Sequence, residues 1–332
     1  MARNAIYPML VAAALAAPLS ARALQCGVPI SASVSLATDL VCTSGDGVVV
    51  GADNLRIDLN GFSILGAGIA GAAGVRSSGF SGIKVVGPGR IAAFEISLAI
   101  DGGRFHEIRD VDVADISPPG SPGAAIWMRN TRDSVIEKSR IGVARIEADP
   151  YLAATGNRIA GNDAAGVQLY GCNASYNDVT GNNMSGASTP GVVVVSGLGN
   201  RIYGNNMYGH VYLGSARQTL VEANTIMSPG PGGWIWTGVL MEDGPAYIAR
   251  CPGPGPFPAR DNVVRANGIL GGHYGVHMGR GAIKNKIMDN KIDGTGTGLY
   301  FAFGADDNEA RGNWLSNVAV PMDDWGRGNT GP

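Results

Sequence analysis

The sequence predicts an all-β solenoid, a stack of coils of about 22 residues in which each strand pairs with its copies in the next coils. A phrase recurs between residues 159 and 315: an aliphatic residue, two variable residues, Asn, one residue and an apolar residue. The asparagines of this phrase are separated by 20, 23, 19, 43, 23 and 23 residues. They are Asn162, Asn182, Asn205, Asn224, Asn267, Asn290 and Asn313. Stacked asparagines at one turn can bond to one another and to the turn backbone.

The composition agrees with many short strands joined by turns. The chain has 332 residues, with 51 Gly, 18 Pro and 16% charged residues. Gly lacks the three-residue period of collagen, and Val and Ile are punctuated by Gly and Asn. Leucine-rich repeats share the repeat length, but the chain has no LxxLxLxxN run and few helix-length periodic segments.

Residues 1–23 are expected to be a secretory signal peptide. Arg3 precedes an apolar stretch from Ile6 to Pro18, and Ala21 and Ala23 flank Arg22 as in an A-x-A cleavage site. A membrane anchor is the alternative, although the apolar stretch is short for a span. We therefore expect a secreted or periplasmic protein with no membrane span after cleavage. Its mature charge of −4, from 23 basic and 27 acidic residues, does not favour a nucleic-acid partner.

The four cysteines of an exported chain indicate disulfides. Cys26 and Cys42 are expected to pair, and closing this loop is worth ~3 kcal/mol in the chain-entropy model. Cys172 and Cys251 are candidates for a second bridge, which the sequence leaves open.

Residues 24–50 are interpreted as an N-terminal cap, because the first coil of a solenoid has no neighbour on its outer side. The solenoid itself is expected over residues 51–332. It begins with the alternating segment from Leu55 to Phe62, and the recurring phrase continues with small residues in place of Asn until Ile141. Counting these copies gives eleven coils.

At its N-terminal end the chain resembles right-handed parallel β-helix repeat proteins of the pectate-lyase-like superfamily. The resemblance rests on Cys26 and Gly27, the run from Asp39 to Cys42, and the run from Ile57 to Gly61. It implies a single-stranded right-handed parallel β-helix over nearly the whole mature chain. That superfamily includes lyases, hydrolases, epimerases and proteins without known catalysis, so the resemblance implies the fold and not an activity.

The 43-residue step between Asn224 and Asn267 predicts an insertion around residues 228–260. Long excursions from a solenoid usually lie on its binding face. The insertion contains Trp234, Trp236 and a Pro-rich loop from Cys251 to Pro258. One further irregular coil is the alternative.

A second strand, usually opened by Gly, follows each copy of the phrase, and alternation places every second residue outward. One outward row is expected to be Arg76, Ser97, Trp127, Glu147, Gln168, Val193, Tyr212, Leu240, His277, Tyr300 and Ala319. A second row, two residues along, is expected to be Ser78, Ala99, Arg129, Asp149, Tyr170, Val195, Gly214, Glu242, Gly279 and Ala302.

Two groups on this face are candidates for function. For uronic-acid lyase chemistry, His277 is the candidate base, Arg280 the group that neutralises the carboxylate, and Tyr300 the acid, with Glu242 beside them. For sugar binding, the candidates are Trp127, Arg129, Gln168, Tyr170 and Tyr212, because flat aromatic rings pack against the C–H faces of sugars. A solvated polar face, or aromatics that shield the sheet, is the simpler interpretation of each group.

The sequence requires no cofactor. Paired acids for glycoside hydrolysis are available in Glu147 with Asp149 and in Glu242 with Asp243, but the motif set of polygalacturonases is missing. Calcium at Asp306 and Asp307, or at Asp323 and Asp324, is conceivable. No metal site is predicted, because the four His residues are scattered along the chain.

These observations predict an exported β-helix whose partner is a polysaccharide or other glycan, which it binds and cleaves by β-elimination. A non-catalytic envelope or surface module that binds carbohydrate is the alternative. The sequence does not choose between them.

Overall fold

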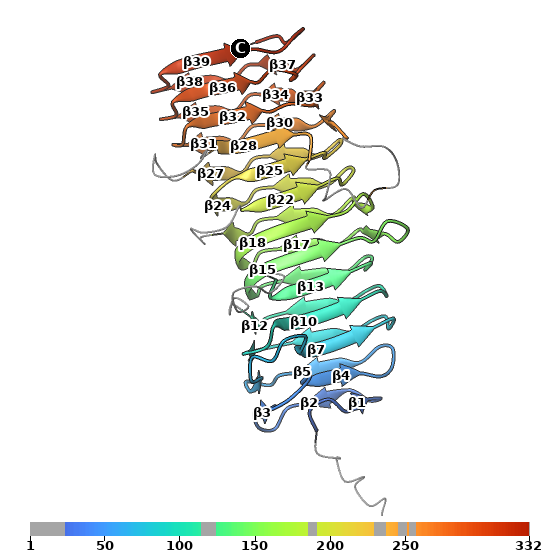
Figure 1. The fold of residues 1–332 in the computed structure, drawn as a ribbon. Coiled ribbons are helices and arrows are strands. Elements are labelled where there is room, and N and C mark those ends of the chain that lie inside the picture. The colour runs from blue at the N-terminus through green and yellow to red at the C-terminus, as the bar shows by residue number, and fades with distance from the viewer. Residues whose placement is uncertain are drawn as a thin grey trace, which may run out of the picture.

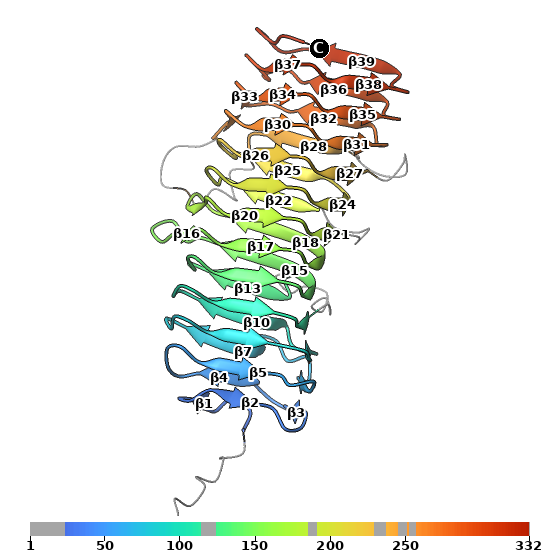
Figure 2. The same cartoon turned by 180° about the vertical axis from the view of Figure 1, so that it is seen from behind.

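The computed structural model describes residues 24–113, 124–184, 191–228, 237–244, 251 and 257–331. The predicted signal peptide, residues 1–23, lies outside these residues. Throughout the described part of the chain, residues form strands and turns and no helix, so no helix there is long and apolar enough to cross a membrane. Figure 1 and Figure 2 show an elongated stack of coils with the N-terminal strands at one end and the C-terminal strands at the other.

Each coil contributes strands to three columns, and neighbouring strands within a column are parallel. The first column consists of β1 (Pro29–Ile30), β4 (Val48–Val50), β7 (Ala73–Ser78), β10 (Ile96–Asp101), β13 (Ile126–Arg129), β15 (Arg140–Glu147), β18 (Asp163–Tyr170), β22 (Val192–Val195), β25 (Val211–Gly214), β28 (Thr237–Glu242), β32 (Tyr274–Met278), β36 (Thr297–Phe301) and β39 (Val320–Asp324). The second column consists of β2 (Val34–Ser35), β5 (Arg56–Asp58), β8 (Lys84–Val86), β11 (Glu107–Arg109), β14 (Val135–Glu137), β17 (Arg158–Ala160), β20 (Asp178–Thr180), β23 (Arg201–Tyr203), β26 (Leu220–Glu222), β30 (Val263–Arg265), β34 (Lys286–Met288) and β37 (Glu309–Arg311).

The third column shares the long strands β15 and β18 with the first, which joins the two columns into one sheet. Its other strands are β3 (Leu40–Val41), β6 (Ser63–Leu65), β9 (Arg90–Ala92), β12 (Asp112–Val113), β21 (Asn183–Met184), β24 (Asn206–Tyr208), β27 (Thr225–Met227), β31 (Gly268–Leu270), β35 (Lys291–Asp293) and β38 (Trp314–Ser316). Two short pairs, β16 (Ala154–Thr155) with β19 (Ala174–Ser175) and β29 (Ala259–Arg260) with β33 (Ala282–Ile283), lie outside these columns.

The predicted all-β parallel β-helix is confirmed, and so is its size. The twelve strands of the second column mark eleven turns of the chain. Residues 29–41 form the first coil, because β1, β2 and β3 pair with β4, β5 and β6. A separate N-terminal cap over residues 24–50 stays a prediction. The expected disulfide between Cys26 and Cys42 is present.

The core is a set of stacked aliphatic residues inside the three columns. The middle residue of each second-column strand points inward, and from β5 onward these side chains are almost fully buried. In register along the stack they are Ile57, Val85, Ile108, Ile136, Ile159, Val179, Ile202, Val221, Val264, Ile287 and Ala310. Because the interior accepts only apolar side chains at this position, the period-two pattern of each short strand is fixed.

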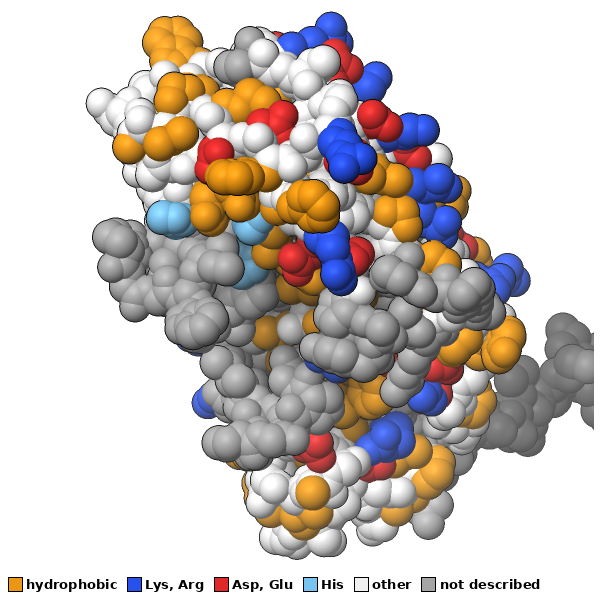
Figure 3. Space-filling model, turned by 45° about the horizontal axis from the view of Figure 1, so that its top comes forward, with side chains coloured by type: hydrophobic (Ala, Val, Ile, Leu, Met, Phe, Trp, Pro, Cys, Tyr) orange, Lys and Arg blue, Asp and Glu red, His pale blue; other side chains and the backbone are white. Residues whose placement is uncertain are grey.

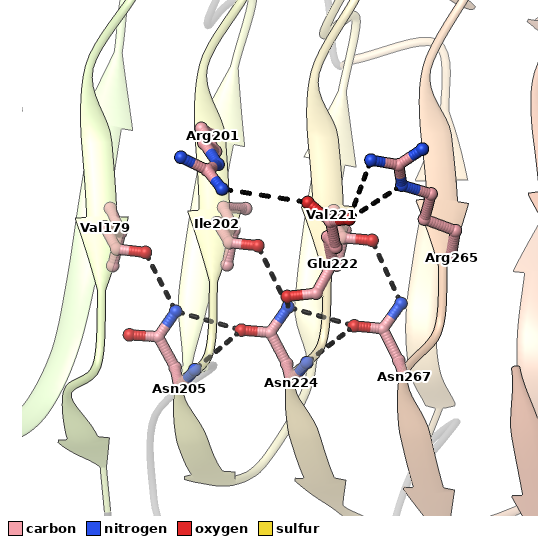
Figure 4. Close-up of polar contacts among 9 residues, drawn as sticks. All are labelled: Val179, Arg201, Ile202, Asn205, Val221, Glu222, Asn224, Arg265 and Asn267. Atoms are coloured by element: carbon pink, nitrogen blue, oxygen red, sulfur yellow. Dashed lines mark hydrogen bonds and ion pairs between the residues drawn. The ribbon is translucent and has the colours of Figure 1, made fainter.

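The asparagines of the recurring phrase form the predicted ladder at the end of the second-column strands. Asn224 is typical of them. Its Oδ1 accepts hydrogen bonds from the backbone N–H and from Nδ2 of Asn205, at 3.0 and 2.9 Å. Its Nδ2 donates to Oδ1 of Asn267 and to the carbonyl of Ile202, both at 3.0 Å (Figure 4). The ladder therefore ties each turn to the coils on both sides.

A second ladder, which the sequence analysis missed, lies at the start of the same strands. Its members are Asn157, Asn177, Asn200, Thr219, Asn262, Asn285, Asn308 and Asn329. Each coil from Asn157 and Asn162 to Asn308 and Asn313 carries one residue of each ladder. The second-ladder residue always comes five positions before the other, and this constant spacing could have been found in the sequence.

In both ladders, the residue immediately before each ladder residue has a positive φ. Gly156 and Gly161, with φ of 68° and 62°, precede Asn157 and Asn162. Such a residue bends the chain sharply at the corner. The following Asn side chain then enters the turn.

The extra residues of the long step are divided between two stretches. The segment 228–260 contains β28, which pairs in register with β25 and β32, while β26 pairs directly with β30. No additional coil therefore separates β26 from β30, and the extra length lies before and after β28. A second disulfide joins Cys172 to Cys251 across 79 residues, so this bridge, left open by the sequence, is present. Trp234, Trp236 and residues 252–256 lie outside the described residues.

Candidate functional site

The outward side chains of the first column, called the first-column face below, carry the candidate residues. Strand register gives the main outward row as Arg76, Ala99, Trp127, Arg145, Gln168, Val193, Tyr212, Leu240, His277, Tyr300 and Asp323. The second row contains Ser78, Asp101, Arg129, Glu147, Tyr170, Val195, Gly214 and, beside Gly279, Glu242.

The predicted register of this face is wrong in three coils. Ala99 takes the place expected for Ser97, Arg145 that of Glu147, and Asp323 that of Ala319. In the second row, Asp101 and Glu147 stand where Ala99 and Asp149 were expected. The error arises because the connection from the third to the first column varies in length, and β15 has no connection at all.

Trp127 and Arg129 contact acids on neighbouring coils. The indole Nε1 of Trp127 donates to Oε2 of Glu147 at 3.0 Å, and the rest of its ring packs against Ala73, Ile96 and Ala99. Arg129 donates from Nε to Asp101 at 3.1 Å and forms an ion pair with it. Trp127 thus both covers the sheet and presents a polar edge.

Arg145, Gln168 and Tyr170 form the next cluster. The Nε of Arg145 donates to Oε1 of Gln168 at 2.9 Å, and its guanidinium carbon lies 5.0 Å from the centroid of the Tyr170 ring. This contact is a cation–π interaction that holds both groups in place.

Tyr212 and Glu242 form a third pair across neighbouring coils. The Tyr212 hydroxyl donates to Oε1 of Glu242 at 3.2 Å. Burial raises the pKa of the Glu242 carboxyl, an effect that the hydrogen bond from Tyr212 opposes. The Glu242 carboxyl therefore keeps its proton to a higher pH than an exposed glutamate does.

His277 lies among aromatic rings. Its imidazole centroid is 4.9 Å from the ring of Tyr300 and 4.9 Å from that of Tyr274, and the two tyrosine rings stack at 4.7 Å. Burial, with a smaller effect of His273, lowers the pKa of His277 to about 4. Its Nδ1 is buried and has no hydrogen-bond partner among the residues that the structure describes. Figure 3 shows histidine side chains bordered by hydrophobic and acidic ones on the later coils.

The structure brings two of the predicted catalytic residues together, whereas Arg280 is paired with Asp243. His277 and Tyr300 are neighbours in register on adjacent coils. Arg280 lies beyond the end of β32, where its Nε donates to Oδ2 of Asp243 at 3.1 Å and 77% of its side chain is exposed. Within the part of the chain that the structure describes, no group of three His, Cys, Asp or Glu residues could hold a metal ion.

Sequence reasoning missed Arg145, Tyr274 and Asp323 as members of this face. Two of them could have been found by counting from the apolar residue that closes the recurring phrase. Gln168 follows Ala164 by four residues, and Arg145 follows Ile141 by the same four. Tyr300 follows Ile292 by eight, and Asp323 follows Leu315 by eight.

Comparison with solved structures finds the same architecture. The chain is similar to the Dettilon tailspike protein, with 14% identity, a TM-score of 0.50, and coverage of 90% of this chain and 60% of the tailspike chain. It is also similar to the catalytic domain of a GH87 alpha-1,3-glucanase in complex with nigerose, with 11% identity, a TM-score of 0.41, and coverage of 91% and 62%. An alginate lyase from Paenibacillus sp. str. FPU-7 shares 12% identity at a TM-score of 0.33, with coverage of 87% and 99%. At such low identity, likeness concerns the fold alone.

No protein with a curated description matches the sequence. The family described as the right handed beta helix region matches residues 145–315, which are 171 of the 332 residues. This match covers the coils with the regular asparagine ladders and the first-column face from Arg145 to Tyr300. The chain belongs to the right-handed beta helix family.

Proposed function

We propose that the protein is an exported polysaccharide-binding protein and that the first-column face from Trp127 to Tyr300 is its binding face. The observation that carries this proposal is a repeated pairing across coils. Trp127 bonds Glu147, Arg145 contacts Tyr170, and Tyr212 bonds Glu242, each reaching one coil on and two residues along. The two disulfides support export, because such bonds persist in oxidising compartments.

This arrangement suits an extended chain of sugars. Aromatic rings offer flat surfaces to the C–H faces of sugars, and the neighbouring carboxylates and amide can bond the hydroxyl groups. Coils follow one another at ~4.8 Å, so a long ligand that lies along the face can contact several of these pairs. A solvated face with no ligand would need no such pre-set aromatic pairs.

A binding experiment tests the proposal. Mature protein is titrated against a panel of acidic and neutral polysaccharides by calorimetry, with Tyr212→Ala and, as matched control, Tyr203→Ala. Tyr203 lies on the second column and stacks with Arg201, away from the proposed face. We expect about a tenfold weaker affinity for Tyr212→Ala, the loss of one aromatic contact, and no change for Tyr203→Ala. Equal effects of the two substitutions, or no glycan binding by the wild type, would overturn the proposal.

Cleavage by β-elimination is the finer form of the proposal. The imidazole of His277, neutral at neutral pH because of its low pKa, would take the proton next to the sugar carboxylate. The electron pair forms the C=C bond as the C–O bond breaks, and Tyr300 gives its proton to the leaving oxygen. Arg280 would neutralise the carboxylate by exchanging Asp243 for it.

An assay for unsaturated product separates this form from a non-catalytic binding module. We expect His277→Ala and Tyr300→Phe to abolish the product and leave affinity within about twofold, because loss of an acid or base removes transition-state stabilisation. Binding without product in the wild type would favour the non-catalytic module and remove the lyase.

A further inference from the structure

Of the arginines that the structure describes, four lie on the first-column face or at its edge, and one of them differs from the others. Arg76 is paired with Asp46, Arg129 with Asp101 and Arg280 with Asp243. Arg145 contacts no carboxylate among the described residues. Its partners there are the neutral side chains of Gln168 and Tyr170.

These neutral partners fix the guanidinium of Arg145 without neutralising it. Nε donates to Gln168, and the guanidinium carbon lies over the Tyr170 ring. The two terminal nitrogens keep their N–H groups for a ligand. A planar pair of N–H donors matches the two oxygens of a carboxylate, and a group already held in place loses little conformational entropy on binding.

We propose that Arg145 recognises the carboxylate of a uronic-acid unit, so that the protein selects acidic over neutral polysaccharides. This inference rests on the proposed binding function and names its substrate class. Trp127 is the register neighbour of Arg145 on the preceding coil, and Tyr170, whose ring the guanidinium contacts, lies on the following one. Glu147, two residues along the strand, accepts the Trp127 indole N–H. Its negative charge directs a ligand carboxylate to the Arg145 side.

The test compares matched ligands that differ only at the carboxylate. Polygalacturonate and alginate are titrated by calorimetry beside their carboxyl-reduced forms, against wild type, Arg145→Met, Arg145→Lys and the control Arg158→Met. Arg158 belongs to β17 of the second column and pairs with Glu137. Folding of each variant is checked by circular dichroism.

We expect wild type to bind the acidic forms at least tenfold more tightly than the reduced forms, the ratio for one charge-assisted pair. Arg145→Met should remove most of this difference and weaken binding of the acidic forms far more than binding of the reduced forms. Arg145→Lys should retain part of the difference, because a lysine keeps the charge and loses the paired donors. Arg158→Met should behave as wild type.

The outcomes separate two failures. Binding of acidic and reduced forms with equal affinity would overturn the role of Arg145 and leave polysaccharide binding intact. If dextran sulfate competes for the protein as effectively as polygalacturonate does, the face attracts anions in general, and the proposed role of Arg145 is also overturned. Absence of binding to every polysaccharide would overturn the binding function itself.

Discussion

The outward faces of the first and second columns use polar residues in different ways. On the second column, charges pair with charges along the stack: Glu222 lies between Arg201 and Arg265, with N–O distances of 3.8 and 2.7 Å (Figure 4). The first-column face also holds ion pairs, as between Arg129 and Asp101. It differs in carrying charged groups that meet neutral ones, as Glu242 meets Tyr212 and Arg145 meets Gln168.

The difference separates stability from recognition. The second column is bordered by two asparagine ladders, and most of its outward charges form ion pairs with their neighbours. The first-column face keeps Arg145, whose partners among the described residues are neutral, so that its charge remains available to a ligand. A solenoid can vary this face coil by coil, because each coil contacts only its neighbours.

The largest effect on stability is expected from removing one ladder residue. Asn224→Ala deprives the buried backbone N–H and Nδ2 of Asn205 of an acceptor and the carbonyl of Ile202 of a donor. Each unsatisfied buried group costs ~1–3 kcal/mol, so we expect a loss of about 3 kcal/mol or more in the free energy of unfolding. The urea midpoint of unfolding, followed by circular dichroism, measures the loss.

Asn206→Ala is the matched control. Asn206 is an exposed neighbour on β24 whose amide donates to Asn183 at 3.2 Å. We expect it to change the free energy of unfolding by no more than about 0.5 kcal/mol. Similar shifts for the two variants would contradict a stabilising role for the buried ladder.

The next prediction concerns pH and the first-column face. The pKa of His277 falls from 6.5 to about 4 on folding, so between these values the unfolded chain binds the additional proton. Stability from the neutral imidazole is therefore complete above pH 6.5 and is lost as the pH falls toward 4. We expect the urea midpoint to drop between pH 7 and pH 5, and to drop less in His277→Gln.

The comparison with the variant is needed because other groups titrate nearby. Burial also lowers the pKa of His106 and of His210, so the wild-type drop includes their protons. Around His277 the titratable neighbours are His273, Tyr274 and Tyr300, and their contribution remains in the variant. An identical drop in wild type and variant would show that His277 is not held neutral by burial.

The fold could be predicted because its signals are local and repeated. Asn205, Asn224 and their equivalents occupy one corner of every later coil, and the burial of their amides forces the same residue type at each step. The second ladder carried an equally regular signal, five residues upstream, and was overlooked. Stacking of identical turns thus makes coil number and corner residues readable from one sequence.

The candidate site was less predictable for two physical reasons. The distance from a phrase to its outward residue varies, from four residues at Gln168 to 14 at Leu240, and the predicted row slipped by two residues at Arg145. Long side chains then choose among several partners within reach, as Arg280 does with Asp243. This choice of partner is not encoded by periodicity.

The smallest predicted effect sharpens the contrast between the two faces. Glu222→Gln removes one charge from the trio with Arg201 and Arg265 and should lower the free energy of unfolding by at most about 1 kcal/mol, since exposed ion pairs contribute little. The loss should shrink in about 1 M salt, where charges are screened beyond ~3 Å.

Glu242→Gln should instead raise the free energy of unfolding at pH 7, because burial already disfavours the Glu242 carboxylate and the amide carries no charge. Urea midpoints of both variants at low and high salt provide the measurement. A salt-sensitive destabilisation by both substitutions would mean that the two faces hold their acids in the same way.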